Sequence, residues 1–282
     1  MIYISTGGFK NLNAIQAIKL LAKYKIYSFE LSGGTYIDNL DLQLKDLPEE
    51  FKLIIHNYFP PPKTPFVLNL ASLNENIYLK SFSHIKKSIK LASLLKSPYY
   101  SFHAGFLIDP NVKELGKNIK ARGLYDKSKS LERFISSLKL LSQYASRYKV
   151  KLLVENNVLT KSNLIKFESN PLLMTDIKST QEIVKSFDDN LFFLCDVAHL
   201  KVSAQTLNFD PSLYLEIFKD QIGGYHLSDN DGLSDSNKMV SKKSWFWPHI
   251  RKDLPYYTLE VYDQNPSVLY SQLELAQHMI YR

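Results

Sequence analysis

Seven side chains that can hold a metal ion or carry a proton stand at or just after the ends of short apolar segments. Imidazole and carboxylate together suit Zn, Mn, Fe or Co, whereas Mg and Ca prefer sites made of oxygen alone. One such residue alone is usually a hydrogen-bonded core residue, but seven ionisable groups in one place are costly to bury without a cation. The sequence therefore predicts a divalent metal centre. The residues are His56, His103, Glu155, Asp196, His199, His226 and Glu260.

Two overlapping ligand sets can be drawn from these residues. His56 and His103 could hold one ion with Glu155 as a bridging ligand, and such paired metals recur in hydrolytic sites. The other set leaves room for substrate oxygens and consists of Glu155, Asp196, His226 and Glu260.

Eight short apolar runs carry these residues. Most are four to six residues long and rich in Ile, Leu, Val, Phe and Tyr, which is typical of buried parallel strands. The expected strands are Ile2–Ser5, Tyr27–Leu31, Leu53–His56, Tyr99–His103, Lys151–Glu155, Leu191–Asp196, Gly223–His226 and Tyr257–Val261.

Helical spacing of apolar residues alternates with these runs. Alternating strands and helices imply a parallel sheet with crossover helices, and eight strands are the number that closes a (β/α)8 TIM barrel, whose active site lies at the carboxyl ends of the strands. We expect one α/β domain over residues 1–282, with His84 and His278 facing solvent on helices and His249 in a loop. The expected helices are Asn11–Tyr24, Asn74–Lys96, Leu124–Tyr148, Thr180–Phe187, Pro211–Phe218 and Pro266–Tyr281.

Composition narrows the class of protein. The chain has 282 residues, 45% of them hydrophobic, and a net charge of +7 from scattered Lys and Arg, which is typical of a solvated basic surface. Cys195 is the only cysteine, so no internal disulfide can form and a reducing, cytoplasmic location is expected. We expect no signal peptide and no membrane span, because no apolar run approaches the required length. A homo-oligomer is compatible with these features.

Six segments carry a resemblance to a known family. They read IIHNYFPPP, YYSFHAG, LLVENN, LCDVAHL, GYHLSDNDG and YTLEVY, in that order along the chain. In this the chain resembles the xylose isomerase-like TIM barrels, which include sugar isomerases, sugar 3-epimerases, inosose dehydratase-type enzymes and endonuclease IV.

The resemblance to the isomerases and epimerases implies one divalent ion, often Mn or Co, with Zn as a further candidate, on the four-ligand set ending in Glu260. It also implies that Glu155 and Glu260 move a proton on and off a carbon next to a carbonyl, and that His199 contacts a sugar substrate. Two positions depart from the ketose 3-epimerase pattern. Lys161 replaces an expected glutamate, and Gly232 replaces an expected arginine.

The resemblance to endonuclease IV implies an alternative function, zinc-dependent cleavage of abasic-site DNA with three zinc ions. The third ion would need His199 and an Asp-x-His loop, but the loop here reads Asp235-Ser236-Asn237, and Asn is a weaker zinc ligand. The FVLNLAS segment around Asn69 is similar to an endonuclease loop, or is a loop with buried leucines. DNA is expected to be a poor partner, because no band of Lys and Arg follows the strand ends.

Metal-dependent isomerisation or epimerisation of a sugar derivative is the preferred hypothesis. A metal would polarise the carbonyl while one glutamate removes the neighbouring proton and the other returns it. A stacking wall could come from Trp245, Trp247 and Phe106, or these rings could pack against helix ends. Lys201 and Arg251 could bind an anionic substituent or be surface charges. The residues predicted to bind substrate are His199, Lys201, Asp235, Asn237 and Trp247.

Overall fold

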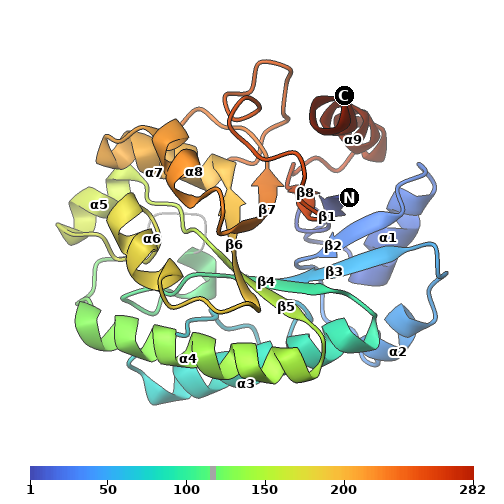
Figure 1. Ribbon diagram of the computed structural model, residues 1–282. Coiled ribbons are helices and arrows are strands. Elements are labelled where there is room, and N and C mark those ends of the chain that lie inside the picture. The colour runs from blue at the N-terminus through green and yellow to red at the C-terminus, as the bar shows by residue number, and fades with distance from the viewer. Residues whose placement is uncertain (115–118) are drawn as a thin grey trace.

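Eight parallel strands close into a barrel in the order in which they occur along the chain, with β8 paired to β1 (Figure 1). The computed structural model describes residues 1–114 and 119–282. The predicted (β/α)8 TIM barrel is thereby confirmed. The strands are β1 Ile2–Ser5, β2 Ser28–Leu31, β3 Lys52–His56, β4 Tyr99–His103, β5 Lys151–Glu155, β6 Leu191–Asp196, β7 Ile222–Leu227 and β8 Tyr257–Leu259.

Helices surround the barrel, and several begin at residues that cap them. Asn13 forms a capping box with Gln16, and Asp210 and Asn265 each precede a proline at the first helical position. The helices are α1 Ala14–Ala22, α2 Leu40–Lys45, α3 Glu75–Leu94, α4 Lys127–Arg147, α5 Lys161–Phe167, α6 Ile177–Val184, α7 Val197–Leu207, α8 Pro211–Phe218 and α9 Pro266–Tyr281, with a 3-10 turn at Val112–Glu114. The sequence analysis did not predict α2, α5 or α7. In the described ranges, no helix has the length and apolar character to cross a membrane.

The strand repeat of two residues determines which side chains point into the barrel. A small interior cluster, separate from the larger core under the helices, contains Leu153 of β5 and Leu194 of β6. Glu155 and Asp196 lie two residues further along these strands, so they point to the same side at the carboxyl end. The apolar interior thus ends in a layer of carboxylates, which is where the predicted metal centre must lie.

His84 does not face solvent as the sequence analysis predicted. Its ring is only 7% exposed and stacks on Tyr58, with the ring of Phe66 edge-on to it. The helix pattern placed His84 on the polar face of α3, but the loop after β3 folds over that face. Burial, followed by the charge of Lys87, lowers the pKa of His84 from 6.5 to about 4.

This burial predicts a specific loss of stability in acid. Above pH 6.5 His84 is neutral in both states; below it, the unfolded chain takes up a proton that the folded chain refuses until the pH nears 4. His84→Phe should therefore reduce the fall in unfolding free energy between pH 7.5 and 5 by about 1–2 kcal/mol in urea titrations. Parallel pH profiles for variant and parent would contradict the assignment.

Candidate metal centre

Four residues converge at the carboxyl end of the barrel, one each from β5, β6 and β7 and one just after β8. Each offers a ligand atom within 4.8 Å of the others, and all four are buried. His226 lies at the middle of the group: its Nδ1 is 3.0 Å from Glu260 Oε2, 3.2 Å from Glu155 Oε1 and farther, 3.9 Å, from an Asp196 oxygen. The structure therefore brings together the predicted set of Glu155, Asp196, His226 and Glu260.

A second group shares Glu155 with the first. Oε2 of Glu155 lies 3.4 Å from His56 Nε2 and 3.3 Å from His103 Nδ1, while Oε1 of Glu155 faces His226. His56 is buried, but a quarter of the His103 side chain is exposed. Glu155 thus presents one oxygen to each group, which is the geometry that a bridging ligand requires.

The donor set fits a divalent cation. Both oxygens of Glu155, Asp196 Oδ2 and His226 Nδ1 are buried without a hydrogen-bond partner among the described residues. Burial, reinforced by the charges of Glu155 and Glu260, raises the pKa of Asp196 to about 8. Burial also acts to raise the pKa of Glu155, but neighbouring imidazoles led by His103 hold it well below its usual value. Unpaired buried lone pairs and facing carboxylates are what a cation would satisfy.

Asp196 has a second role that fixes its position. It caps α7, because its carboxylate accepts a hydrogen bond of 2.7 Å from the backbone N–H of His199. The Asp-x-x-His spacing is therefore the spacing of an N-cap, and it leaves Oδ2 of Asp196 directed toward the cluster.

Glu30 of β2 is a site residue that the sequence analysis missed. It is fully buried, and its Oε2 accepts hydrogen bonds from His226 Nε2 at 2.9 Å, from Thr258 Oγ1 at 2.9 Å and from the Tyr256 hydroxyl. Because an ionised carboxylate only accepts, it favours the proton of His226 on Nε2 and leaves Nδ1 as a lone-pair donor toward the cluster. An acidic residue inside the apolar run 27–31 was the available signal.

The network continues from Glu30 to the second group. The Tyr256 hydroxyl lies 2.9 Å from Ser101 Oγ, which in turn lies 2.9 Å from His56 Nδ1. His226 and His56 are therefore oriented by one buried set of hydrogen bonds beneath the carboxylates.

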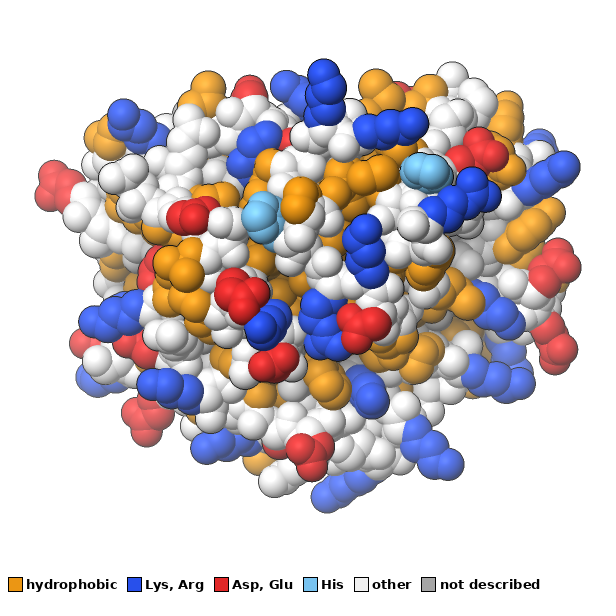
Figure 2. All heavy atoms as spheres, turned by 45° about the horizontal axis from the view of Figure 1, so that its top comes forward, with side chains coloured by type: hydrophobic (Ala, Val, Ile, Leu, Met, Phe, Trp, Pro, Cys, Tyr) orange, Lys and Arg blue, Asp and Glu red, His pale blue; other side chains and the backbone are white. Residues whose placement is uncertain are grey.

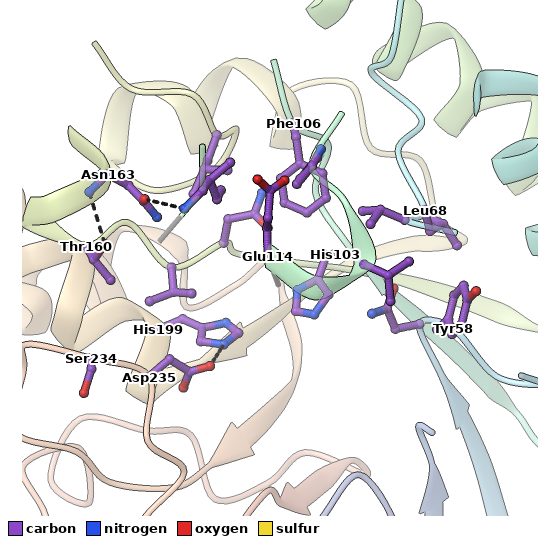
Figure 3. Close-up of a pocket in the computed structure, with 18 of the residues that line it drawn as sticks. Tyr58, Leu68, His103, Phe106, Glu114, Thr160, Asn163, His199, Ser234 and Asp235 are labelled. Carbon is purple, nitrogen blue, oxygen red and sulfur yellow. Dashed lines mark hydrogen bonds and ion pairs between the residues drawn. The ribbon is translucent and has the colours of Figure 1, made fainter. Parts of the chain in front are cut away.

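His199 and Asp235 form a pair at the edge of the cluster. His199 Nδ1 is 3.0 Å from the carbonyl of Asn156, and Nε2 is 3.3 Å from Asp235 Oδ2. Burial opposes the charged ring, but Asp196 and Asp235 raise the pKa of His199 well above 6.5. Both His199 and Asp235 line a cavity of about 600 Å³ that also reaches His103 (Figure 3).

The other predicted substrate residues lie elsewhere or are already paired. Lys201 contacts Asp229 at 2.8 Å and the carbonyl of Asn230, so its charge stabilises the loop after β7. Asn237 is buried with φ of 42°, and its carbonyl accepts from Tyr262 N–H. Trp247 is in the hydrophobic core, with its indole N–H on the carbonyl of Ser241. The structure does not bring Lys201, Asn237 or Trp247 to the described cavity wall.

Of the other residues considered in the sequence analysis, some line the cavity and others do not. Arg251 pairs with Asp253 on the surface, whereas Phe106 does line the cavity. Asn69 of the FVLNLAS segment is fully buried and donates to the carbonyls of Phe106 and Ile108. Asn69 therefore joins the loops after β3 and β4, and the segment shapes the cavity.

We expect Glu30→Gln to weaken metal binding by about 10–100-fold, because an amide no longer fixes the His226 tautomer while the shape of the residue is kept. The check is a titration of chelator-treated protein with Zn or Mn against a chromophoric competitor. Thr258→Val, which removes one uncharged donor to the same oxygen, should have the smaller effect. An unchanged dissociation constant for Glu30→Gln would exclude this role.

Comparisons with solved structures agree with the fold. A D-tagatose 3-epimerase-like protein has a TM-score of 0.75 at 19% identity, covering 99% of this chain and 97% of its own. A protein from Thermus thermophilus, soaked with ZnCl2, has a TM-score of 0.65 at 20% identity, with 98% of each chain covered. A D-psicose 3-epimerase with D-tagatose from Clostridium cellulolyticum has a TM-score of 0.68 at 14% identity, with 99% of each covered.

No curated protein matches the chain. The family model described as xylose isomerase-like TIM barrel matches residues 18–255, a range that contains Glu155, Asp196 and His226. Since this match covers most of the chain, the protein belongs to the xylose isomerase-like TIM barrel family.

Proposed function

We propose that the protein is a divalent-metal-dependent isomerase or epimerase that acts on a sugar derivative by moving a proton next to a carbonyl. The observation that carries the proposal is the pair of buried glutamates, Glu155 and Glu260, whose oxygens lie 3.2 and 3.0 Å from His226 Nδ1. Their cluster connects through His103 to a cavity large enough for a small-molecule substrate. The sugar epimerases of similar fold support this reaction class.

The residues divide the work as follows. Glu155, Asp196, His226 and Glu260 would hold the ion, which we expect to be Zn, Mn or Co. When bound, such an ion supplies Lewis-acid polarisation of the carbonyl and the adjacent hydroxyl.

One of the two glutamates accepts the proton from the carbon next to the carbonyl, and the other returns a proton to the substrate. His199 lines the cavity, with its two ring nitrogens on the Asn156 carbonyl and Asp235, so its ring and the Asp235 carboxylate are placed to contact a substrate. Glu30 keeps His226 in one orientation throughout.

Two features argue against a free ketose as in the ketose 3-epimerase pattern. Gly232, at the position of the expected arginine, has φ of +80°, and a Cβ there would lie 1.9 Å from Gln205 Oε1. Lys161 is the exposed first residue of α5. The backbone at Gly232 thus favours glycine, and the substrate must be held by other side chains.

Cys195 is a buried free thiol, so a reducing, cytoplasmic compartment remains the expected location.

Glu155→Gln and Glu260→Gln should each lower turnover by about two orders of magnitude or more, because each glutamate is expected to carry a proton as well as bind the ion. The measurement is deuterium incorporation from solvent next to the carbonyl, with candidate ketoses, inososes and keto-glycosides screened on metal-loaded protein. Glu216→Gln, an exposed glutamate on α8, is the matched control. Activity within about tenfold of the parent would remove that glutamate from the mechanism.

A second candidate function is zinc-dependent cleavage of abasic-site DNA. The group of His56, His103 and Glu155 favours it, because it provides ligands for a second ion. Asn237 in place of a histidine argues against DNA cleavage. So does the face of the molecule in Figure 2, on which Lys and Arg are scattered among acidic side chains. Incision of an abasic-site duplex by zinc-loaded protein at about 150 mM salt would establish this function instead.

A further inference from the structure

The cavity beside the metal centre is lined by two chemically different sets of residues, several of which are labelled in Figure 3. His103, His199 and Asp235 form the polar side, next to the carboxylate cluster. Much of the remaining lining is hydrocarbon and forms an apolar wall, which comes from the loops after β3, β4 and β7 and from the segment between α5 and α6. Its side chains include Phe66, Leu68, Phe106, Val112, Leu172 and Leu233.

Three polar side chains near this wall, Glu114, Asn163 and Asn157, are hydrogen-bonded within the protein. Both oxygens of Glu114 bind the Arg122 guanidinium at 2.7 Å, and each also accepts a backbone N–H. Asn163 Oδ1 accepts from the N–H of Ile119, and the Asn157 amide donates to the carbonyls of Ala104, after β4, and Leu173, between α5 and α6. These contacts connect the loops and occupy polar atoms that a ligand would otherwise meet there.

Among the described residues that line the cavity, Leu233 and Val112 are the large apolar side chains that remain exposed. Leu233 is 65% exposed and Val112 is 43% exposed, although both line the cavity. The position of Leu233 is held locally, because Asp231 Oδ1 accepts the backbone N–H of Leu233 and of Ser234. Apolar surface that is held open beside a polar centre gains stability when an apolar ligand group covers it.

A free sugar does not match this cavity. A polyol carries a hydroxyl on nearly every carbon, and a hydroxyl buried against hydrocarbon without a partner is unfavourable. A sugar that also bears a hydrocarbon group would match both sides. We propose that the substrate is a glycoside or similar sugar derivative with an alkyl or aryl substituent, its ring at the polar side and its substituent against the wall. The assignment of the ring to the polar side rests on the proposed function.

The test compares methyl, butyl and phenyl β-D-glucopyranosides binding to zinc-loaded protein by calorimetry. Butyl or phenyl glucoside should bind at least about tenfold more tightly than methyl glucoside, since each buried methylene strengthens binding several-fold. The butyl and phenyl arms distinguish an alkyl from an aryl substituent. Leu233→Asp should remove most of this gain. Ile165→Asp is the matched control, because Ile165 is also 65% exposed but does not line the cavity, and it should retain the gain.

Equal affinities for the three glucosides, no measurable binding of the phenyl compound, or a gain that survives in Leu233→Asp would each overturn the inference. The corresponding 3-keto-glucosides test the substituent and the proposed reaction separately, since they carry both a carbonyl and the substituent. A preference for the phenyl compound without deuterium exchange next to the ketone would refute only the proposed reaction. Exchange with equal affinity for the methyl and phenyl compounds would refute only the substituent.

Discussion

Mutual repulsion among buried carboxylates is the constraint on which the rest of this structure depends. Glu30, Glu155 and Asp196 are fully buried and Glu260 nearly so, around the imidazole of His226. Water cannot reach these charges, so protein donors or a bound cation must balance them. The barrel supplies the geometry: strand repeats of two place the carboxylates in one layer above an apolar interior.

The strands and the loops of the protein have separate roles. The strands and the network of Glu30, Tyr256, Ser101 and His56 orient the candidate ligands from below, where packing and hydrogen bonds allow little movement. The loops above determine what enters. Asn69 connects the loops after β3 and β4, because its side-chain amide donates hydrogen bonds to the carbonyls of Phe106 and Ile108. These hydrogen bonds help to shape the cavity wall. Chemistry and specificity can therefore change independently within one fold.

The sequence predicted the strands and the ligand cluster because both follow a short-range rule. An apolar run of four to six residues that ends in His, Asp or Glu places that residue at the mouth of a parallel barrel, as at His103 and Glu155. Glu30 escaped this rule because it precedes the last residue of its strand. The helix α7 was not predicted, because Asp196 is both the last residue of β6 and the N-cap of α7.

Residues away from the strand ends were less predictable, since the direction of their side chains depends on contacts with neighbouring loops. Trp247 is turned into the core by its bond to Ser241, and Lys201 is held by Asp229. His84 is covered by Tyr58 and Phe66, which lie in the loop between β3 and its own helix, α3. No local pattern encodes these contacts.

The metal content of untreated protein tests the central claim most directly. Elemental analysis after gel filtration should find at least one Zn, Mn or Co ion per chain, because the buried carboxylates need a positive partner. The ion should be lost in Asp196→Asn, which removes a ligand charge and keeps the size of the cap residue. Protein that is folded, free of divalent metal and unable to bind added Zn, Mn or Co would contradict the account.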